Sequence, residues 1–116
     1  MSEIQKRRIF RVNRFAVPAE GRQEFMMLVH RTHEVIRTQP GVVDDLILEQ
    51  HSSAGPFNVL SILQFEGEHV LQPVIAAVAK SDEEAGIDRQ ALSRRLGVET
   101  DIGFYHSAVL QELLPA

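Results

Sequence analysis

Three polar side chains are the main candidates for chemistry in this sequence: Asn13, His69 and His106. An amide offers donors and an acceptor to an oxygen atom of a ligand. A histidine with an ordinary pKa can accept or release a proton near neutral pH. Each residue also has a plainer interpretation, in which Asn13 satisfies nearby backbone groups and His69 is a solvated turn residue. The sequence alone leaves these alternatives open.

Two other histidines, His30 and His33, are three residues apart on a predicted helix, a spacing that metal ligands can use. Their order does not match a zincin motif, and a third ligand is not evident. His30 also points away from the apolar side of the helix. We therefore predict surface positions for both residues and no metal site. No nucleotide-binding loop is predicted either, because the glycines are isolated.

The elements that must position these side chains begin with a strand, a helix and a second strand. Residues 8–17 are rich in β-branched and aromatic side chains, which predicts a strand. Residues 22–38 predict a helix that ends before Pro40-Gly41, and residues 42–50 predict the next strand. Apolar positions at helical spacing give the helix one buried stripe, made of Phe25, Leu28, Val29, Thr32 and Ile36.

The second half predicts two more strands and two more helices. Residues 57–65 are apolar on both faces, which is typical of a central strand, and residues 100–111 form the fourth strand. A helix should start near Gln72, and a short one should run over 89–96 between Asp88 as N-cap and Gly97 as its stop. The buried stripe of the longer helix is predicted at Val70, Leu71, Val74, Ile75 and Val78.

This order, βαββα(α)β, predicts an α+β ferredoxin-like fold with a four-stranded antiparallel sheet and an extra short helix before the last strand. We expect the third strand to run parallel to the first, so that it ends near Asn13. Phe65, His69 and Phe104 would then line one pocket mouth together with Asn13. His106 would lie one step deeper, on the same face as Phe104.

Length and composition predict that residues 1–116 form a single globular domain. Of its residues 44% are hydrophobic and 24% are charged, and the net charge is −4. This charge provides no basic surface for nucleic acid or for an anionic membrane. No apolar run is long enough to span a bilayer, so a cytoplasmic location is expected. Cysteine is absent, which excludes disulfides and thiolate chemistry.

Helices on one side of such a sheet would leave its other face bare. The predicted strands carry apolar residues on both faces, and leaving an apolar face in water costs about 25 cal/mol per Å². A homodimer joined through the sheet faces would cover it.

At this point the chain resembles the antibiotic biosynthesis monooxygenase (ABM) family of the dimeric α/β-barrel superfamily. The resemblance extends over roughly residues 8–110, with 81–98 longer than usual. It rests on VPAEG at 17–21, QPGV at 39–42, LSILQF at 60–65 and DIGFY at 101–105. It implies two sheets packed face to face in a dimer, with a pocket in each subunit between the sheet and the helices.

Heme-degrading members of that superfamily are similar at Asn13-Arg14 and at residues 101–103. Their pocket combines an Asn on the first strand, a Trp at the end of the third strand and a His ligand on the second helix. Asn13 matches the first of these. Phe65 stands in place of the Trp, and the predicted second helix has no His to hold the iron. Heme degradation is therefore disfavoured.

The resemblance implies a monooxygenase that needs no cofactor and acts on a small phenolic or hydroquinone-like compound. Asn13, His69 and His106 would be its catalytic residues, and Phe65 and Phe104 would bind the aromatic substrate. The protein would supply a dry pocket, a base and hydrogen bonds to the developing anion. The alternative is a small-molecule-binding protein without catalysis, or an isomerase or lyase of the same superfamily.

Overall fold

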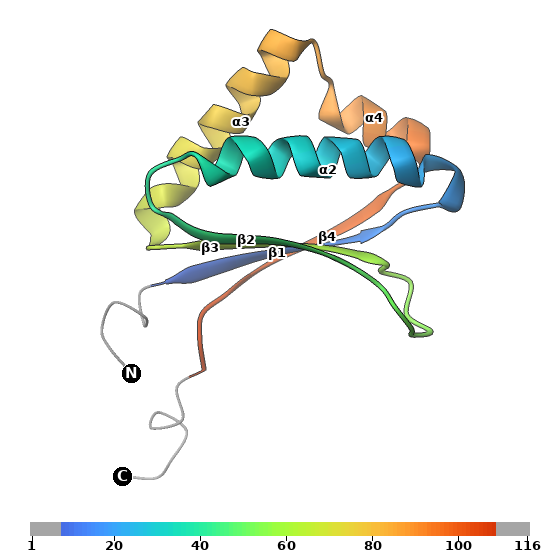
Figure 1. Ribbon diagram of the computed structural model, residues 1–116, viewed down its shortest axis with the longest axis horizontal. Coiled ribbons are helices and arrows are strands. Elements are labelled where there is room, and N and C mark those ends of the chain that lie inside the picture. The colour runs from blue at the N-terminus through green and yellow to red at the C-terminus, as the bar shows by residue number, and fades with distance from the viewer. Residues whose placement is uncertain (1–7, 109–116) are drawn as a thin grey trace, which may run out of the picture.

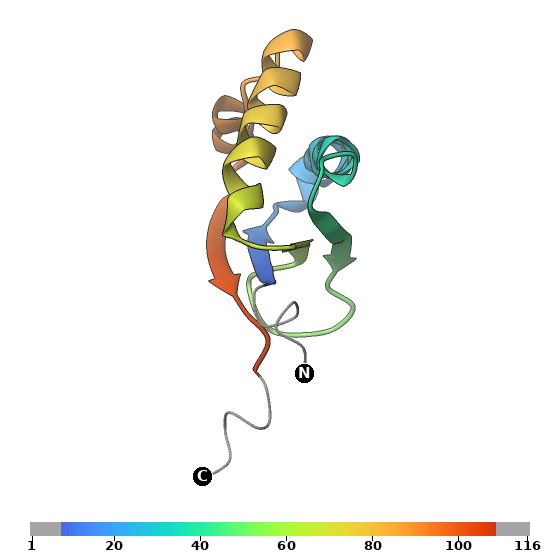
Figure 2. The same cartoon turned by 90° about the vertical axis from the view of Figure 1, so that its left-hand side faces the viewer.

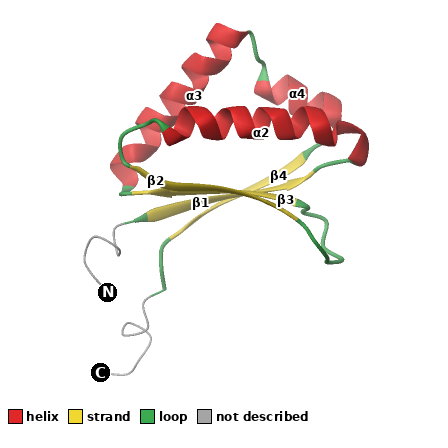
Figure 3. Cartoon of the chain, in the orientation of Figure 1, coloured by secondary structure: helices red, strands yellow, loops and turns green. Residues whose placement is uncertain are grey.

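The computed structural model describes residues 8–108 and has helices on one face of a four-stranded antiparallel sheet (Figures 1 and 3). The strands lie in the order β2-β3-β1-β4. Their bounds, with those of the helices, are β1 Ile9–Ala16, α2 Arg22–Arg37, β2 Val42–Glu49, β3 Val59–Phe65, α3 Leu71–Ala85, α4 Arg89–Leu96 and β4 Glu99–Tyr105. Short 3₁₀ turns, η1 Ala19–Gly21 and η2 Glu68–Val70, lead into α2 and α3. The predicted ferredoxin-like fold is confirmed, including the short helix before the last strand.

The direction of β3 differs from the prediction. β3 is antiparallel to β1, with Asn13 opposite Ser61 and Ile9 opposite Phe65. The parallel arrangement predicted above is wrong, for a topological reason. The crossover through α2 leaves β1 and β2 running the same way, and β3 returns from β2 into the gap between them, antiparallel to both. Phe65 therefore lies at the start of β1, four residues from the level of Asn13.

Helix α2 lies along the sheet, and local signals set its ends. It stops at Thr38, and the chain then turns at Gly41, whose φ of +86° is open to glycine at little cost. The buried side chains of α2 are Phe25, Leu28, Val29, His33 and Ile36. Four of the five predicted stripe positions are thus confirmed. The fifth buried position is His33 instead of Thr32, which is half-buried and bonds back to the Leu28 carbonyl.

Helix α3 rises steeply from the sheet, and α4 returns toward it (Figures 1 and 2). The start of α3 packs against the sheet, because Val70 and Val74 join the core around Phe65. Ile75 is 45% exposed, so its predicted burial is wrong: the side of the helix that packs against the core carries Val74 and Val78. Pro73 lies in the first turn, where its missing N–H has no partner to lose.

The short helix α4 has the caps that its sequence predicts. The carboxylate of Asp88 accepts a hydrogen bond from the Ala91 amide, and Gly97 closes the helix with a φ of +73°. The fourth strand was predicted over 100–111 and runs from Glu99 to Tyr105; positions 109–111 of that prediction lie outside the described residues.

A β-bulge lies at the start of β2. Val42 is opposite Phe65 and Asp44 is opposite Gln64, which leaves Val43 as an extra residue without a partner on β3. After the bulge, Asp45 is opposite Leu63 and Ile47 is opposite Ser61. Because side chains alternate along a strand, Asp45 and Ile47 face the helices.

The face of the sheet away from the helices is uncovered within the described part of the chain (Figure 3). The strand register places Leu46, Ile62 and Val12 side by side on this face. Leu46, Leu48 and Tyr105 are exposed there. We call this surface the open face.

Candidate functional site

Three polar side chains are buried between the sheet and α2: His33 is 1% exposed, Ser61 4% and Asn13 8%. They form one connected row of hydrogen bonds. His33 Nε2 lies 2.6 Å from Ser61 Oγ, and Asn13 Nδ2 lies 3.2 Å from the same oxygen. His33 Nδ1 lies 3.1 Å from Asp45 Oδ2. Arg11 Nε lies 3.0 Å from Asn13 Oδ1, at the other end. We call these five residues the polar row.

Arg11 fixes the direction of the two hydrogen bonds that the Asn13 side chain makes. A guanidinium only donates, so the bonded Asn13 atom is Oδ1, and Nδ2 donates to Ser61. When the imidazole is neutral, Nδ1–H of His33 donates to the carboxylate of Asp45, and Nε2 accepts a hydrogen bond from the Ser61 hydroxyl. This pattern needs a neutral imidazole, and all its donors and acceptors agree.

Burial of His33 favours the neutral form of its imidazole. Burial lowers the pKa of His33, and the hydrogen bond to Asp45 only partly opposes this effect. Arg37 donates to both oxygens of Asp45 at 3.0 and 2.8 Å, which holds the pKa of that carboxyl below its usual value. Asp45 therefore stays ionised beside a neutral imidazole.

On the β4 side, the polar row borders two exposed apolar side chains. Ile102 is opposite Asn13 in the sheet and is 47% exposed, and Phe104 is opposite Arg11 and is 54% exposed. The guanidinium of Arg11 lies 5.7 Å from the centre of the Phe104 ring, a cation–π contact. Burial and the positive charge of Arg89 lower the pKa of Arg11. The arrangement combines an apolar floor with a fixed amide, which suits a flat ligand that carries an oxygen atom.

Of the residues predicted from the sequence, Asn13 and Phe104 lie in or beside this site. The partners that Asn13 needed inside the protein are Ser61 and Arg11. Phe65 is buried in the core at the start of β1, and His69 is exposed in η2, just beyond it. His106 is also exposed and lies just past the end of β4, with its Nδ1 next to the Ser107 carbonyl. The structure does not bring these three residues to Asn13.

The surface position predicted for His33 is wrong, whereas His30 is exposed as predicted. The signal for burial was present, since His33 is four residues after Val29 and three before Ile36, on the apolar side of the helix. Sequence reasoning also missed Ser61 and Asp45. Nothing local marks them, because their roles depend on strand register.

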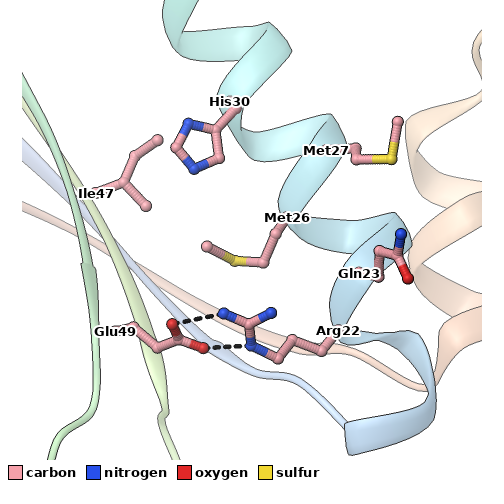
Figure 4. Close-up of a pocket in the computed structure, with 7 residues that line it drawn as sticks. All are labelled: Arg22, Gln23, Met26, Met27, His30, Ile47 and Glu49. Carbon is pink, nitrogen blue, oxygen red and sulfur yellow. Dashed lines mark hydrogen bonds and ion pairs between the residues drawn. The ribbon is translucent and has the colours of Figure 1, made fainter.

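A separate groove of about 530 Å³ lies on the other side of α2, next to β2 (Figure 4). Met26, His30 and Ile47 line it, and the ion pair between Arg22 and Glu49 borders one end. Those two charged groups satisfy each other, which leaves few polar atoms to orient a ligand. The groove shares no residue with the polar row.

Neither a metal cluster nor a membrane-spanning helix is found in the part of the chain that the structure describes. Among residues 8–108, no three His, Asp or Glu side chains gather closely enough to hold a metal ion. None of the helices there is both long and apolar enough to cross a membrane.

Solved structures with the same fold include ABM-type proteins. A candidate antibiotic biosynthesis monooxygenase from Deinococcus radiodurans superposes with a TM-score of 0.65 at 14% identity, over 87% of this chain and 93% of that one. The resemblance inferred from the sequence is thus confirmed at the level of the fold.

Two further neighbours have the same TM-score of 0.65. SnoaB, a cofactor-independent oxygenase from Streptomyces nogalater, is 18% identical, and the match covers 88% of this chain and 94% of SnoaB. A conserved protein from Methanosarcina mazei Go1 is 26% identical, over 90% of this chain and 97% of that one. No protein-family model matches the sequence, and no curated protein has a significantly similar sequence.

Proposed function

We propose that the protein is a cofactor-independent monooxygenase that acts on a small phenolic or hydroquinone-like compound. The observation that carries the proposal is the fixed amide of Asn13, buried beside the exposed apolar side chains of Ile102 and Phe104. The fold shared with SnoaB supports it.

The proposed chemistry begins with ionisation of the substrate hydroxyl. An electron-rich aromatic anion can react with O₂ directly, so the protein has to bind, deprotonate and shield it. The second Nδ2 proton of Asn13 and the guanidinium of Arg11 are suited to stabilise that anion. Phe104 and Ile102 would contact the ring. His69, His106 and Phe65 lie elsewhere, and the proposed chemistry does not require them.

The test is Asn13→Ala, with melting and turnover measured on the same preparation. If Asn13 only satisfies buried groups, the change costs about 1–3 kcal/mol of stability and the specific activity persists. If Asn13 binds the substrate oxygen, we expect turnover to fall about tenfold for each 1.4 kcal/mol of transition-state stabilisation lost. Oxygen uptake over a panel of hydroxyaromatic compounds provides the assay. Gln23→Ala, an exposed amide on α2, is the matched control.

We also propose that a second copy of the chain covers the open face. Leu46, Leu48 and Tyr105 are exposed there on a sheet that has helices only on its other side. Monomeric proteins rarely leave such an apolar surface in water, and a two-fold axis would cover both copies at once.

A further inference from the structure

We propose that Asp45, His33 and Ser61 form a proton relay, in which Ser61 takes the hydroxyl proton of the ligand and passes its own proton to His33. The proposal rests on the proposed function in one respect: a compound with an acidic hydroxyl has to bind beside Asn13. Its ionisation does not depend on oxygen, so the relay would serve an isomerase equally well.

Ser61 Oγ has one hydrogen-bond acceptor position without a partner among the side chains of the polar row. A hydroxyl has one donor and two acceptor positions. The donor goes to His33 Nε2 at 2.6 Å, and one acceptor position takes the Asn13 amide at 3.2 Å. The remaining lone pair fits a donor O–H. A ligand hydroxyl bound there would be separated from the imidazole that is to receive the proton by the Ser61 oxygen alone.

The transfer moves two protons, and it produces an anion on the ligand and an imidazolium on His33. The O–H bond of the ligand breaks, and its proton goes to Ser61 Oγ while the hydroxyl proton of Ser61 goes to His33 Nε2. The ligand keeps the electron pair as an anion. The imidazolium that forms is bonded to the carboxylate of Asp45 through Nδ1–H.

Other charges near His33 belong to its own helix. Arg37 is paired with Asp45, and His30 lies one turn away. Asp45 on β2 is the single carboxylate bonded to the ring within the described residues. Burial keeps the pKa of His33 low, so that the free site holds a neutral base at neutral pH.

Access to the relay comes from β4. Ser61, Asn13 and Ile102 come from three neighbouring strands in register, and their exposed fractions rise from 4% to 8% to 47%. A ring seated on Ile102 would thus extend its hydroxyl along this line toward Asn13 and Ser61. The closed end of the line is His33, which reaches no solvent of its own.

The same three residue types act in serine hydrolases, where the serine is a nucleophile. That role needs several donors around the oxyanion, usually backbone amides, alone or together with a side-chain amide. Ser61 lies on a central strand that is paired on both sides, in line with Asn13 of β1 and Ile47 of β2. Its backbone is committed to the sheet, so proton transfer suits the site better than acyl transfer.

The experiment is an anaerobic titration of bound 4-nitrophenol, whose neutral and ionised forms absorb at different wavelengths. We expect the wild-type protein to lower the pKa of the bound probe by one unit or more, a tenfold rise in its ionisation constant. Ser61→Ala should remove the part of the shift that the relay supplies and leave only the part due to Asn13 and Arg11, and Asp45→Asn should reduce the shift. His30→Gln changes an exposed imidazole on the same helix and should leave the shift intact.

The results that would overturn the relay are distinct from those that would overturn the oxygenase. A probe that fails to bind, or a shift that is as large in both Ser61→Ala and Asp45→Asn as in the wild type, contradicts the relay. An acetyl group found on Ser61 after treatment with 4-nitrophenyl acetate would make the serine a nucleophile instead. If the probe ionises but no hydroxyaromatic compound consumes oxygen, the relay stands and the monooxygenase proposal fails.

Discussion

Replacing Ser61 by alanine removes a single oxygen atom. The loss of stability should nevertheless be large for so small a change. The change leaves Cβ in place, so it removes almost no packing. It does leave two buried groups without a partner: the Nε2 atom of His33 and one amide proton of Asn13. Both side chains are less than a tenth exposed, so water cannot replace the lost oxygen.

The expected loss follows from those two groups. A buried donor or acceptor without a partner costs about 1–3 kcal/mol. His33 and Asn13 each keep one other hydrogen bond, to Asp45 and to Arg11, so we take about 1.5 kcal/mol for each, in the lower half of that range. The sum is about 3 kcal/mol. For a domain of this size, 1 kcal/mol shifts the melting temperature by about 4 °C, which predicts a fall of about 12 °C.

A double-mutant cycle with His33→Leu shows whether this reasoning is right. In that background the imidazole is gone, so Ser61→Ala leaves only the Asn13 amide unpaired, and its cost should fall to about half. Ser52→Ala, an exposed serine in the loop before β3, should change stability by less than about 0.5 kcal/mol. The reasoning fails if Ser61→Ala lowers melting by less than about 4 °C, or if its cost is the same in both backgrounds.

Stability should also depend on the charge of His33. Because burial lowers its pKa, the unfolded chain binds this proton first as pH falls below 6.5; stability is thus fully present above that pH and declines as pH drops toward the lower folded pKa. His33→Leu should flatten this part of the melting profile, and an unchanged slope would contradict the assignment. If a second copy covers the open face, light scattering should give twice the 13.1 kDa chain mass, and Leu46→Lys with Leu48→Lys should return it to the monomer. A monomeric wild type at micromolar concentration would refute the dimer. Gly41→Ala should cost more than about 1–2 kcal/mol, since φ is +86° and an added Cβ would lie 2.4 Å from Val70 Cγ2. Melting unchanged within error would show that the turn can relax.

The helices and strands were predictable wherever residues act on their immediate neighbours. Pro40-Gly41 ends α2, Asp88 begins α4 and Gly97 ends it, each through bonds or sterics within a few residues. β3 was placed centrally because both its faces are apolar, and it does lie between β2 and β1. Such signals need no knowledge of the rest of the fold.

The site was less predictable because it depends on pairing between distant segments. Asn13 could be singled out as a polar residue among Phe10, Val12 and Phe15, which favour burial. Its partner Ser61 is 48 positions away, and the wrong direction for β3 placed Phe65 beside Asn13 in its stead. His33 was predicted to be a surface residue because its spacing from His30 matches no zincin motif and no third ligand is evident in the sequence. Its actual partners, Ser61 and Asp45, reach it only through the pairing of distant strands.

The bulge at Val43 bears on which changes of length this chain can tolerate. Deleting Val43 would leave Val42 and Asp44 as consecutive partners of Phe65 and Gln64, with every later pair unchanged. Deleting one residue further along, between Asp45 and Ile47, would exchange the two sides of the strand beyond that point. Among related sequences, gaps should therefore collect before Asp44. From Asp45 to Ile47 the spacing should be constant even where the residues themselves differ.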